Sequence, residues 1–296
     1  WVLASQVVRE QEVRIAAMAD LKSKDLAQWL AERHADIRLM ARNPALLELF
    51  TRMQLNRKLN WQQRAAAWRD EQLLAAWLED TRATYGFISV EVLTMSGIPL
   101  SSAGSTPYSV RQLIPMLSRA ATGDRSNLED MQMTQEGQPY FALAATMPLD
   151  WGLEPMVLVF AIDARANLYP LFELGPETTR TGQLLLFRRG ARGLEILNRA
   201  SDSRQWFQPV DDIALYTPVR TTQEMGADFE STLRGVGYAG NHVILAKRSV
   251  VGSPWWVVMQ VDLEELHRPV VALALVCGTL ALLGVLISGG VLVLIW

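Results

Sequence analysis

The 28 residues that follow Arg268 contain no charged side chain. They read PVVALALVCGTLALLGVLISGGVLVLIW and occupy residues 269–296. A helix needs roughly 20 consecutive apolar residues to cross a bilayer, and a charge near its centre would cost several kcal/mol. We therefore predict a transmembrane helix over residues 269–296. The alternative is a buried helix of a soluble core, but such helices seldom run this long without a polar residue.

Small side chains recur along one face of this predicted helix. They are Ala274, Gly278, Ala281, Gly284 and Ser288. Small residues let two helices approach closely in lipid, so this face is a candidate dimer contact. The alternative is an incidental pattern, because apolar helices contain many Ala and Gly residues.

The first residues, WVLASQVV, contain no initiator Met and no basic region of a signal peptide. We expect residues 1–8 to be the end of an earlier transmembrane helix, with Trp1 near the membrane interface. Two crossings would place residues 9–268 outside the cytoplasm.

Charge and composition argue against several classes of function. The formal net charge of −3 disfavours nucleic-acid binding, which requires a basic surface. Cys277 is the only cysteine, so no disulfide can form within the chain. His34, His242 and His267 lack the spacing of a metal site, and neither a nucleophile elbow nor a P-loop occurs. We expect no metal, no cofactor and no catalytic activity in this segment.

One motif match has the wrong context. The residues GVGYAG at 235–240 fit G-x-G-x-x-G, but a dinucleotide site needs a strand before the motif and a helix after it. We predict a helix around residues 222–233 before it and a strand after it. The match is therefore interpreted as a loop leading into a hairpin.

The first third of the chain has a helical pattern. Apolar residues recur at steps of three and four over residues 9–42, with charges between them. Asn43 is a predicted N-cap and Pro44 a predicted first helical residue, so a new helix starts there. A further helical stretch is predicted over residues 61–84.

From Tyr85 onward, short β-rich runs alternate with turn signals. A first unit, residues 85–175, has predicted strands at 86–94, 98–101, 127–134, 140–148 and 155–162 and predicted helices at 109–121 and 163–173. A second unit, residues 176–268, has predicted strands at 183–188, 194–198, 241–250 and 255–261.

The ends of the two units align without a gap. The stretch VLVFAIDARANLYP (157–170) matches WVVMQVDLEELHRP (256–269), which places Asp163 on Asp262 and Pro170 on Pro269. In both stretches an apolar strand ends in Asp and a helix follows. The pattern suggests two copies of one module.

Taken together, these features resemble the double Cache sensor domains of bacterial transmembrane receptors. The resemblance lies in three stretches: DLAQWLAERHADIRLMARNP, SRAATGDRSNLEDMQMTQEGQPYFALAATMPL and GYAGNHVILAKRSVVGSPWWVVMQVDLEEL. It implies an α+β fold with a long N-terminal helix, followed by two PAS-like antiparallel-sheet modules and the C-terminal transmembrane helix.

The resemblance also implies a function and a location. A small molecule would bind the membrane-distal module (85–175), and the membrane-proximal module (176–268) would pass the signal to the lipid-embedded helix. We expect a protein of the bacterial inner membrane, homodimeric through its N-terminal and transmembrane helices, with residues 9–268 periplasmic or extracellular. The amino-acid-binding branch carries an Arg-x-Trp-Tyr motif in the distal module, which is missing between Tyr85 and Asp163.

Asp163 is the one clear counterpart of that branch's binding residues. Its carboxylate could pair with an amine at the mouth of a pocket. The alternative is a helix N-cap, which an Asp between a strand and a helix commonly forms. Asp262 and Glu265 have the spacing of a capping box, which favours the cap at the equivalent position.

Four other side chains of the first unit are candidate ligand-binding residues. They are Tyr108, Arg111, Tyr140 and Trp151. Arg111 would suit a carboxylate, because guanidinium can donate two parallel hydrogen bonds to it. The alternative is a solvated Arg on the predicted helix 109–121.

Two other classes of function stay open at this stage. One is a membrane-anchored module that binds a periplasmic protein through the helices before Tyr85. The other is a membrane-anchored enzyme with catalytic residues that no known motif reveals.

Overall fold

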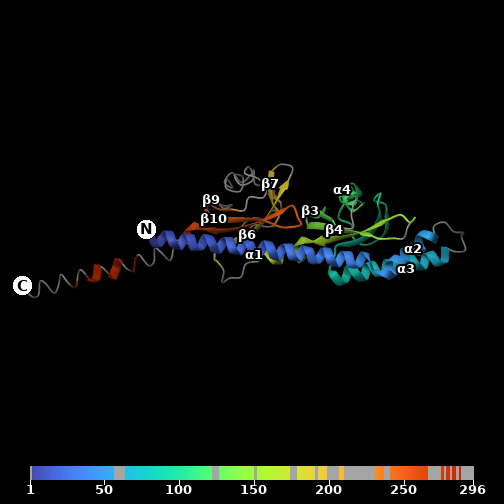
Figure 1. Cartoon of the computed structure of the whole chain (residues 1–296), viewed down its shortest axis with the longest axis horizontal. Helices are drawn as coiled ribbons and strands as arrows, with labels where there is room; N and C mark the ends of the chain where they lie inside the picture. Colours follow the sequence, from blue (N-terminus) through green and yellow to red (C-terminus); the bar gives the residue numbers. More distant parts are fainter. Residues whose placement is uncertain are drawn as a thin grey trace, which may run out of the picture. The chain divides into compact units, whose positions relative to one another are not determined.

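The computed structural model describes most of the chain (Figure 1). The described residues are 2–56, 64–121, 127–149, 152–173, 179–190, 193–198, 207–209, 231–236, 241–265, 275–276, 278–280, 282–284 and 287. They form two compact units. The first comprises Asp25–Leu171 with Gly252–Pro254, and the second comprises Trp1–Lys24, Phe172–Val251 and Trp255–Trp296.

Three helices precede the first sheet, and their bounds are α1 (Val2–Ala41), α2 (Pro44–Asn56) and α3 (Arg64–Tyr85). The predicted break is confirmed, because the Ala45 N–H donates to Asn43 Oδ1 at 3.0 Å and α2 begins at Pro44. Arg52 of α2 donates to the Asp70 carboxylate of α3 at 3.2 Å. This ion pair holds the two helices together.

The first sheet is antiparallel with the strand order β2-β1-β5-β4-β3. Its strands are β1 (Ser89–Thr94), β2 (Pro99–Gly104), β3 (Asn127–Met133), β4 (Pro139–Met147) and β5 (Met156–Asp163). A turn at Ser96-Gly97 connects β1 to β2: the Gly97 N–H donates to the Thr94 carbonyl, and Gly97 has a φ of +84°. An added Cβ at Gly97 would lie 2.4 Å from Val110 Cγ1, so this turn requires glycine.

Both faces of the first sheet are covered. On one face Trp29 of α1 packs edge-on against Phe141 with ring centroids 6.0 Å apart, and Phe87 packs against Phe160. The other face is covered by α4 (Val110–Ala121), which lies on the opposite side of β3 and β4 from α1 (Figure 1). As a result all six residues of β1 are buried.

The second sheet repeats this arrangement. Its order is β8-β7-β6-β11-β10-β9, so β7-β6-β11-β10-β9 correspond to β2-β1-β5-β4-β3. The strands are β6 (Gln183–Gly190), β7 (Gly193–Ile196), β8 (Gln208–Pro209), β9 (Ser231–Val236), β10 (His242–Ser249) and β11 (Trp255–Asp262). The final strands, β5 and β11, begin and end at positions that the sequence alignment equates. The shared strand order therefore supports the predicted duplication.

One predicted element of the second unit is wrong. Residues 231–233, expected to end a helix, instead belong to β9, which pairs with β10 from Ser231↔Lys247 to Val236↔His242. The rest of that predicted helix, 222–230, lies outside the described residues. Since Gly235 and Val236 are in this edge strand and β10 follows, the G-x-G-x-x-G match does not open a helix.

The predicted membrane segments are described only in part. Residues 2–8 form the beginning of α1. In the C-terminal segment, the helical residues are 275–276, 278–280, 282–284 and 287. Among the residues that the structure describes, no helix has both the length and the apolar character needed to span a bilayer. The rest of the predicted segment 269–296, with Ala274, Ala281 and Ser288, lies outside the described residues, and the transmembrane helix stays a prediction.

Candidate functional site

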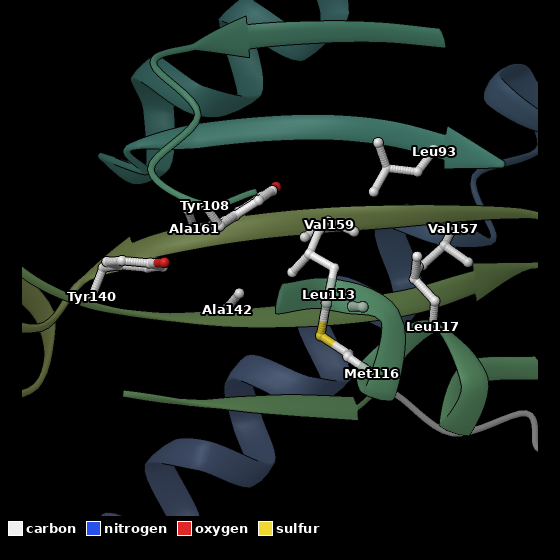
Figure 2. Packing of buried hydrophobic residues seen from close by; sticks show 11 residues of the cluster. Leu93, Tyr108, Leu113, Met116, Leu117, Tyr140, Ala142, Val157, Val159 and Ala161 are labelled. Carbon is white, nitrogen blue, oxygen red and sulfur yellow. The ribbon is translucent and has the colours of Figure 1, made fainter. Parts of the chain in front are cut away.

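The candidate site is the face of the first sheet that α4 covers, which we call the α4 face. Register places Leu93, Val157 and Ala144 on it, together with Val159 and Ala161. From α4, Leu113, Met116 and Leu117 pack onto these strands and are almost fully buried. Figure 2 shows this apolar cluster, with Tyr108 and Tyr140 at one end and Leu93, Val157 and Leu117 at the other.

The position of α4 follows from its sequence. Ser109 precedes the helix, and its backbone N–H donates to Gln112 Oε1 at 2.7 Å. This is one half of a capping box, which fixes where the helix begins. The apolar residues at 113, 116 and 117 then share one side, whereas Arg111 on the other side is exposed. Arg111 therefore points away from the α4 face, and the prediction that it binds a carboxylate ligand there is not supported by its position.

The structure brings two predicted site residues together. Tyr108 lies in the loop between β2 and α4, Tyr140 lies on β4, and their ring centroids are 6.4 Å apart. Both are buried, with exposed fractions of 9% and 2%. Burial raises the pKa of Tyr140 to about 12 and, together with the nearby Glu91 charge, raises the pKa of Tyr108 well above its ordinary value. Both phenols therefore stay protonated and can donate hydrogen bonds.

Beside Tyr108 lies a buried carboxylate that sequence reasoning did not single out. Glu91 of β1 pairs with Val159 in the register, so it lies on the α4 face. It is 3% exposed and accepts a hydrogen bond from the Thr106 hydroxyl. Burial is the largest influence on Glu91 and raises the pKa of its carboxyl, although Thr106 and Tyr108 favour the charged form.

Two hydroxyl groups next to Glu91 are not satisfied. The Tyr108 hydroxyl is close enough to Ser89 and to the Glu91 carboxylate for both groups to influence the pKa of its phenol. Nevertheless both hydroxyl oxygens are buried without a hydrogen-bond partner of acceptable geometry. Orphaned buried hydroxyls are costly and uncommon in folded proteins. Ser89, Glu91, Thr106 and Tyr108 are therefore called the polar cluster, and they form a set of groups that a ligand could satisfy.

The sequence pattern around this cluster is compatible with two structures, a strand with one solvated face and a strand that is buried on both faces. Ser89 and Glu91 alternate with Val90 and Val92, which is the usual pattern of a strand with one solvated face. The structure places β1 between β2 and β5 with both faces covered. A charged residue in such a strand is buried and therefore calls for a specific explanation.

Asp163 is an N-cap in the structure. It ends β5 opposite Tyr140, and its Oδ1 accepts the Arg165 backbone N–H at 2.8 Å at the start of α5 (Ala164–Asn167). The Arg165 guanidinium also lies 3.1 Å from the same carboxylate. Both carboxylate oxygens already have donors. The N-cap alternative is therefore the one that the described contacts support.

Near the start of β3, Glu129 also places a carboxylate on the α4 face. It pairs with Ala142 in the register and lies 3.3 Å from the Arg119 guanidinium of α4. Trp151, the remaining predicted site residue, lies outside the described residues. In the described part of the chain, no group of three or more His, Cys, Asp or Glu side chains could hold a metal ion.

The capping box predicted at the equivalent position of the second unit is wrong. Glu265 instead accepts the Arg180 and Thr181 backbone N–H groups, both at 2.8 Å, and the Thr181 hydroxyl. The Asp262 N–H donates to the same hydroxyl at 3.1 Å. We call this arrangement the Glu265 clasp. It lines a small open cavity of about 270 Å³ and ties the segment before β6 to the end of β11.

Comparison with solved structures identifies the fold. The ligand-binding domain of the Pseudomonas aeruginosa PAO1 amino acid chemoreceptor PctB, in complex with L-glutamine, matches with a TM-score of 0.56 at 16% identity over 86% of this chain and 92% of that chain. The ligand-binding domain of the Pseudomonas fluorescens chemoreceptor CtaA, in complex with L-serine, matches with a TM-score of 0.56 at 15% identity over 86% and 98%. The extracellular domain of vpHK1S-Z8, classed as a histidine kinase, matches with a TM-score of 0.58 at 13% identity over 88% and 96%.

The chain has the fold of these sensor domains. The predicted resemblance is confirmed for the fold, which has a long N-terminal helix followed by two antiparallel sheets. No protein-family profile and no curated protein sequence matches the chain. At such low identity the comparison identifies the architecture alone.

Proposed function

We propose that this chain is the ligand-sensing part of a transmembrane signalling receptor and binds a small molecule on the α4 face of the first sheet. The polar cluster is the observation that carries this proposal. It combines a buried carboxylate with two unpartnered buried hydroxyls, next to apolar walls from α4 and the sheet. Ligand sites commonly combine a few convergent polar groups with an apolar lining. The likeness to ligand-binding domains of chemoreceptors supports the same assignment.

The second unit would pass the signal onward. The Glu265 clasp fixes the end of β11, and the segment 266–296 follows it directly in sequence. A shift of the second sheet would therefore reach the predicted transmembrane helix at 269–296 through a short connection. A ligand that binds one arrangement of the receptor more tightly than another would shift the populations of the two. The proposed location is the bacterial inner membrane, with residues 9–268 outside the cytoplasm.

A thermal-shift screen of the full chain tests ligand binding directly. The panel contains amines, organic acids, amino acids and neutral alcohols. A ligand at 100 times its Kd stabilises the bound protein by about 2.7 kcal/mol, which corresponds to a rise in Tm of several degrees. We expect at least one class to produce such a rise, and Tyr140→Phe, which removes one hydroxyl from the α4 face, to reduce it. A panel without any stabilising compound would contradict the proposal.

A protein-interaction module is the second candidate, favoured by one observation. Leu55 of α2 and Trp68 and Leu73 of α3 are more than half exposed, at 52%, 62% and 54%. Exposed large apolar side chains often mark protein contacts. Pull-down with the full chain and with a Trp68→Ala, Leu73→Ala variant distinguishes the candidates, since small-molecule sensing does not need these side chains.

A further inference from the structure

We infer that the ligand of this chain carries a positively charged group, and that Glu91 of β1 binds this group together with the hydroxyls of the polar cluster. The inference rests on the proposed function and names the chemical class of the ligand. It also assigns recognition to a carboxylate in a central strand, whereas the sequence predicted the carboxylate at the end of β5, Asp163.

The carboxylates of the α4 face differ in whether a cation neutralises them. Three carboxylates lie there by register: Glu91, Glu129 and Asp163. Glu129 pairs with Arg119, and Asp163 pairs with Arg165. Among the described residues Glu91 makes no ion pair, and it is the most deeply buried of the three. A buried carboxylate without a cation is costly, and a cationic ligand would offset that cost.

The groups next to Glu91 are hydrogen-bond acceptors of the kind that an ammonium group requires. An ammonium group presents up to three N–H donors. Glu91 is an acceptor, and one of its carboxylate oxygens already accepts a hydrogen bond from the Thr106 hydroxyl. The Ser89 and Tyr108 oxygens have lone pairs available, because among the described residues neither makes a hydrogen bond of acceptable geometry, and a Tyr108 O–H directed at Glu91 uses only its proton. Three oxygen atoms at one place therefore suit one ammonium group. A carboxylate ligand would meet Glu91 as a like charge.

The protonation state of Glu91 should control how tightly a cation binds. Burial raises the pKa of the Glu91 carboxyl, so its neutral acid form persists to higher pH than that of an exposed glutamate. A cation stabilises the carboxylate, so binding releases a proton from Glu91. The affinity for a cation is therefore low below the raised pKa, increases as pH rises through it, and is constant above it. The other titratable groups on this face are Tyr108, Tyr140, Glu129 and Asp163, and the two carboxylates are paired with Arg119 and Arg165. The two phenols stay neutral throughout.

The experiment uses the full chain and probes of matched size. n-Butylamine, putrescine and tyramine are the cations, 1-butanol is the neutral probe and butyrate is the anion. Thermal shift identifies binding, and isothermal titration calorimetry gives Kd between about pH 5 and about pH 8, where the amines stay protonated. Glu91→Gln removes the charge with little change of shape. Asp163→Asn is the matched control, because it removes a strand-end charge and keeps a capping oxygen.

We expect a cationic probe to raise Tm, and Glu91→Gln to weaken its binding by about 10- to 100-fold, since a hydrogen bond to a charged group is lost. Asp163→Asn should bind as the unmodified chain does. Affinity should rise with pH in the unmodified chain and be flat in Glu91→Gln. Circular dichroism and the Tm of each variant establish that it is folded.

Two results would overturn the inference. One is undiminished amine binding by Glu91→Gln in its folded form. The other is stabilisation by butyrate or 1-butanol without any binding of the cationic probes, which would leave the proposed sensing function standing. Failure of every compound in the wider panel is a separate result, because it contradicts the proposed function itself.

Discussion

Asp163 and Asp262 end the last strand of each sheet, and their surroundings differ. The Asp163 carboxylate caps α5 and lies beside Arg165. The Asp262 carboxylate accepts from Asn241 Nδ2 at 3.1 Å, and its backbone N–H goes to Thr181. The same residue at the same point of a duplicated module therefore serves two local purposes. The two residues thus share their position at the end of a strand, whereas the hydrogen-bond partners of their side chains differ.

This difference gives a prediction for Asp163. Asp163→Ala should lower the free energy of unfolding by about 1 kcal/mol, because the first turn of α5 loses its capping oxygen. Asp163→Asn should cost much less, since its side-chain oxygen can accept the same N–H. Urea unfolding followed by circular dichroism measures both. Equal losses of stability in the two variants would indicate that the ion pair with Arg165, rather than the cap, is the important contact.

At the scale of elements, apolar periodicity correctly predicted the helices and strands that bury one regular face. It failed for a strand whose formation depends on pairing with a neighbouring strand. The helix at 9–42 and the strands β4, β5, β10 and β11 agree with prediction because their apolar spacing is regular. The strand β9 was missed because it is held only at the sheet edge by β10, and its own residues carry little apolar signal. Non-local pairing of this kind is not visible in a window of sequence.

The same limit explains which part of the site was predictable. Tyr108 and Tyr140 were identified as aromatic residues with a polar end, and they do meet. Glu91 was missed because period-two alternation cannot distinguish a solvated face from a face that another helix covers. Only the order β2-β1-β5, which depends on residues about 70 positions apart, shows that β1 is central.

The Glu265 clasp gives a prediction at this scale. Burial alone would raise the pKa of Glu265, but hydrogen bonds from Thr181 and Arg180 outweigh it and lower the pKa below the ordinary value. A lowered pKa in the folded state means that the clasp contributes stability above pH 4.5, the ordinary value, and that this stability is lost as pH falls below 4.5 toward the folded value. Glu265→Gln should remove this pH-dependent contribution.

Chemical unfolding of the full chain between about pH 3 and about pH 7 measures the effect. The difference in the free energy of unfolding between the unmodified chain and Glu265→Gln should be largest near neutral pH and should shrink as the pH is lowered. Glu136→Gln, at an exposed turn position between β3 and β4, is the control and should follow the unmodified chain. A difference that grows toward low pH would contradict the clasp.

At the scale of the whole molecule, α1 carries three large, exposed apolar side chains among its described residues. Val13, Leu21 and Leu39 are exposed at 70%, 58% and 73%. Leu39 lies five full turns after Leu21, and Val13 lies within about 80° of both around the helix axis. Exposed apolar side chains aligned along a long helix are typical of a helix–helix contact. This face is where we expect the contact of the homodimer that the sequence predicts.

Leu21→Glu should therefore convert a dimer into a monomer, because it places a charge in the apolar contact. Sedimentation velocity of the full chain in detergent measures the state. Leu73→Glu, which alters an equally exposed leucine on α3, should leave the dimer intact. Dimers that survive Leu21→Glu, or a chain that is monomeric without any substitution, would exclude this face as the contact.

The α4 face of the first sheet is the proposed binding site for a small molecule. Hydrogen–deuterium exchange of the full chain, with and without the most stabilising compound of the thermal-shift panel, tests it most directly. We expect slower exchange in β1, in α4 and in the loop that carries Thr106 and Tyr108. Slower exchange confined to the second sheet, with no change in β1 and α4, would contradict it.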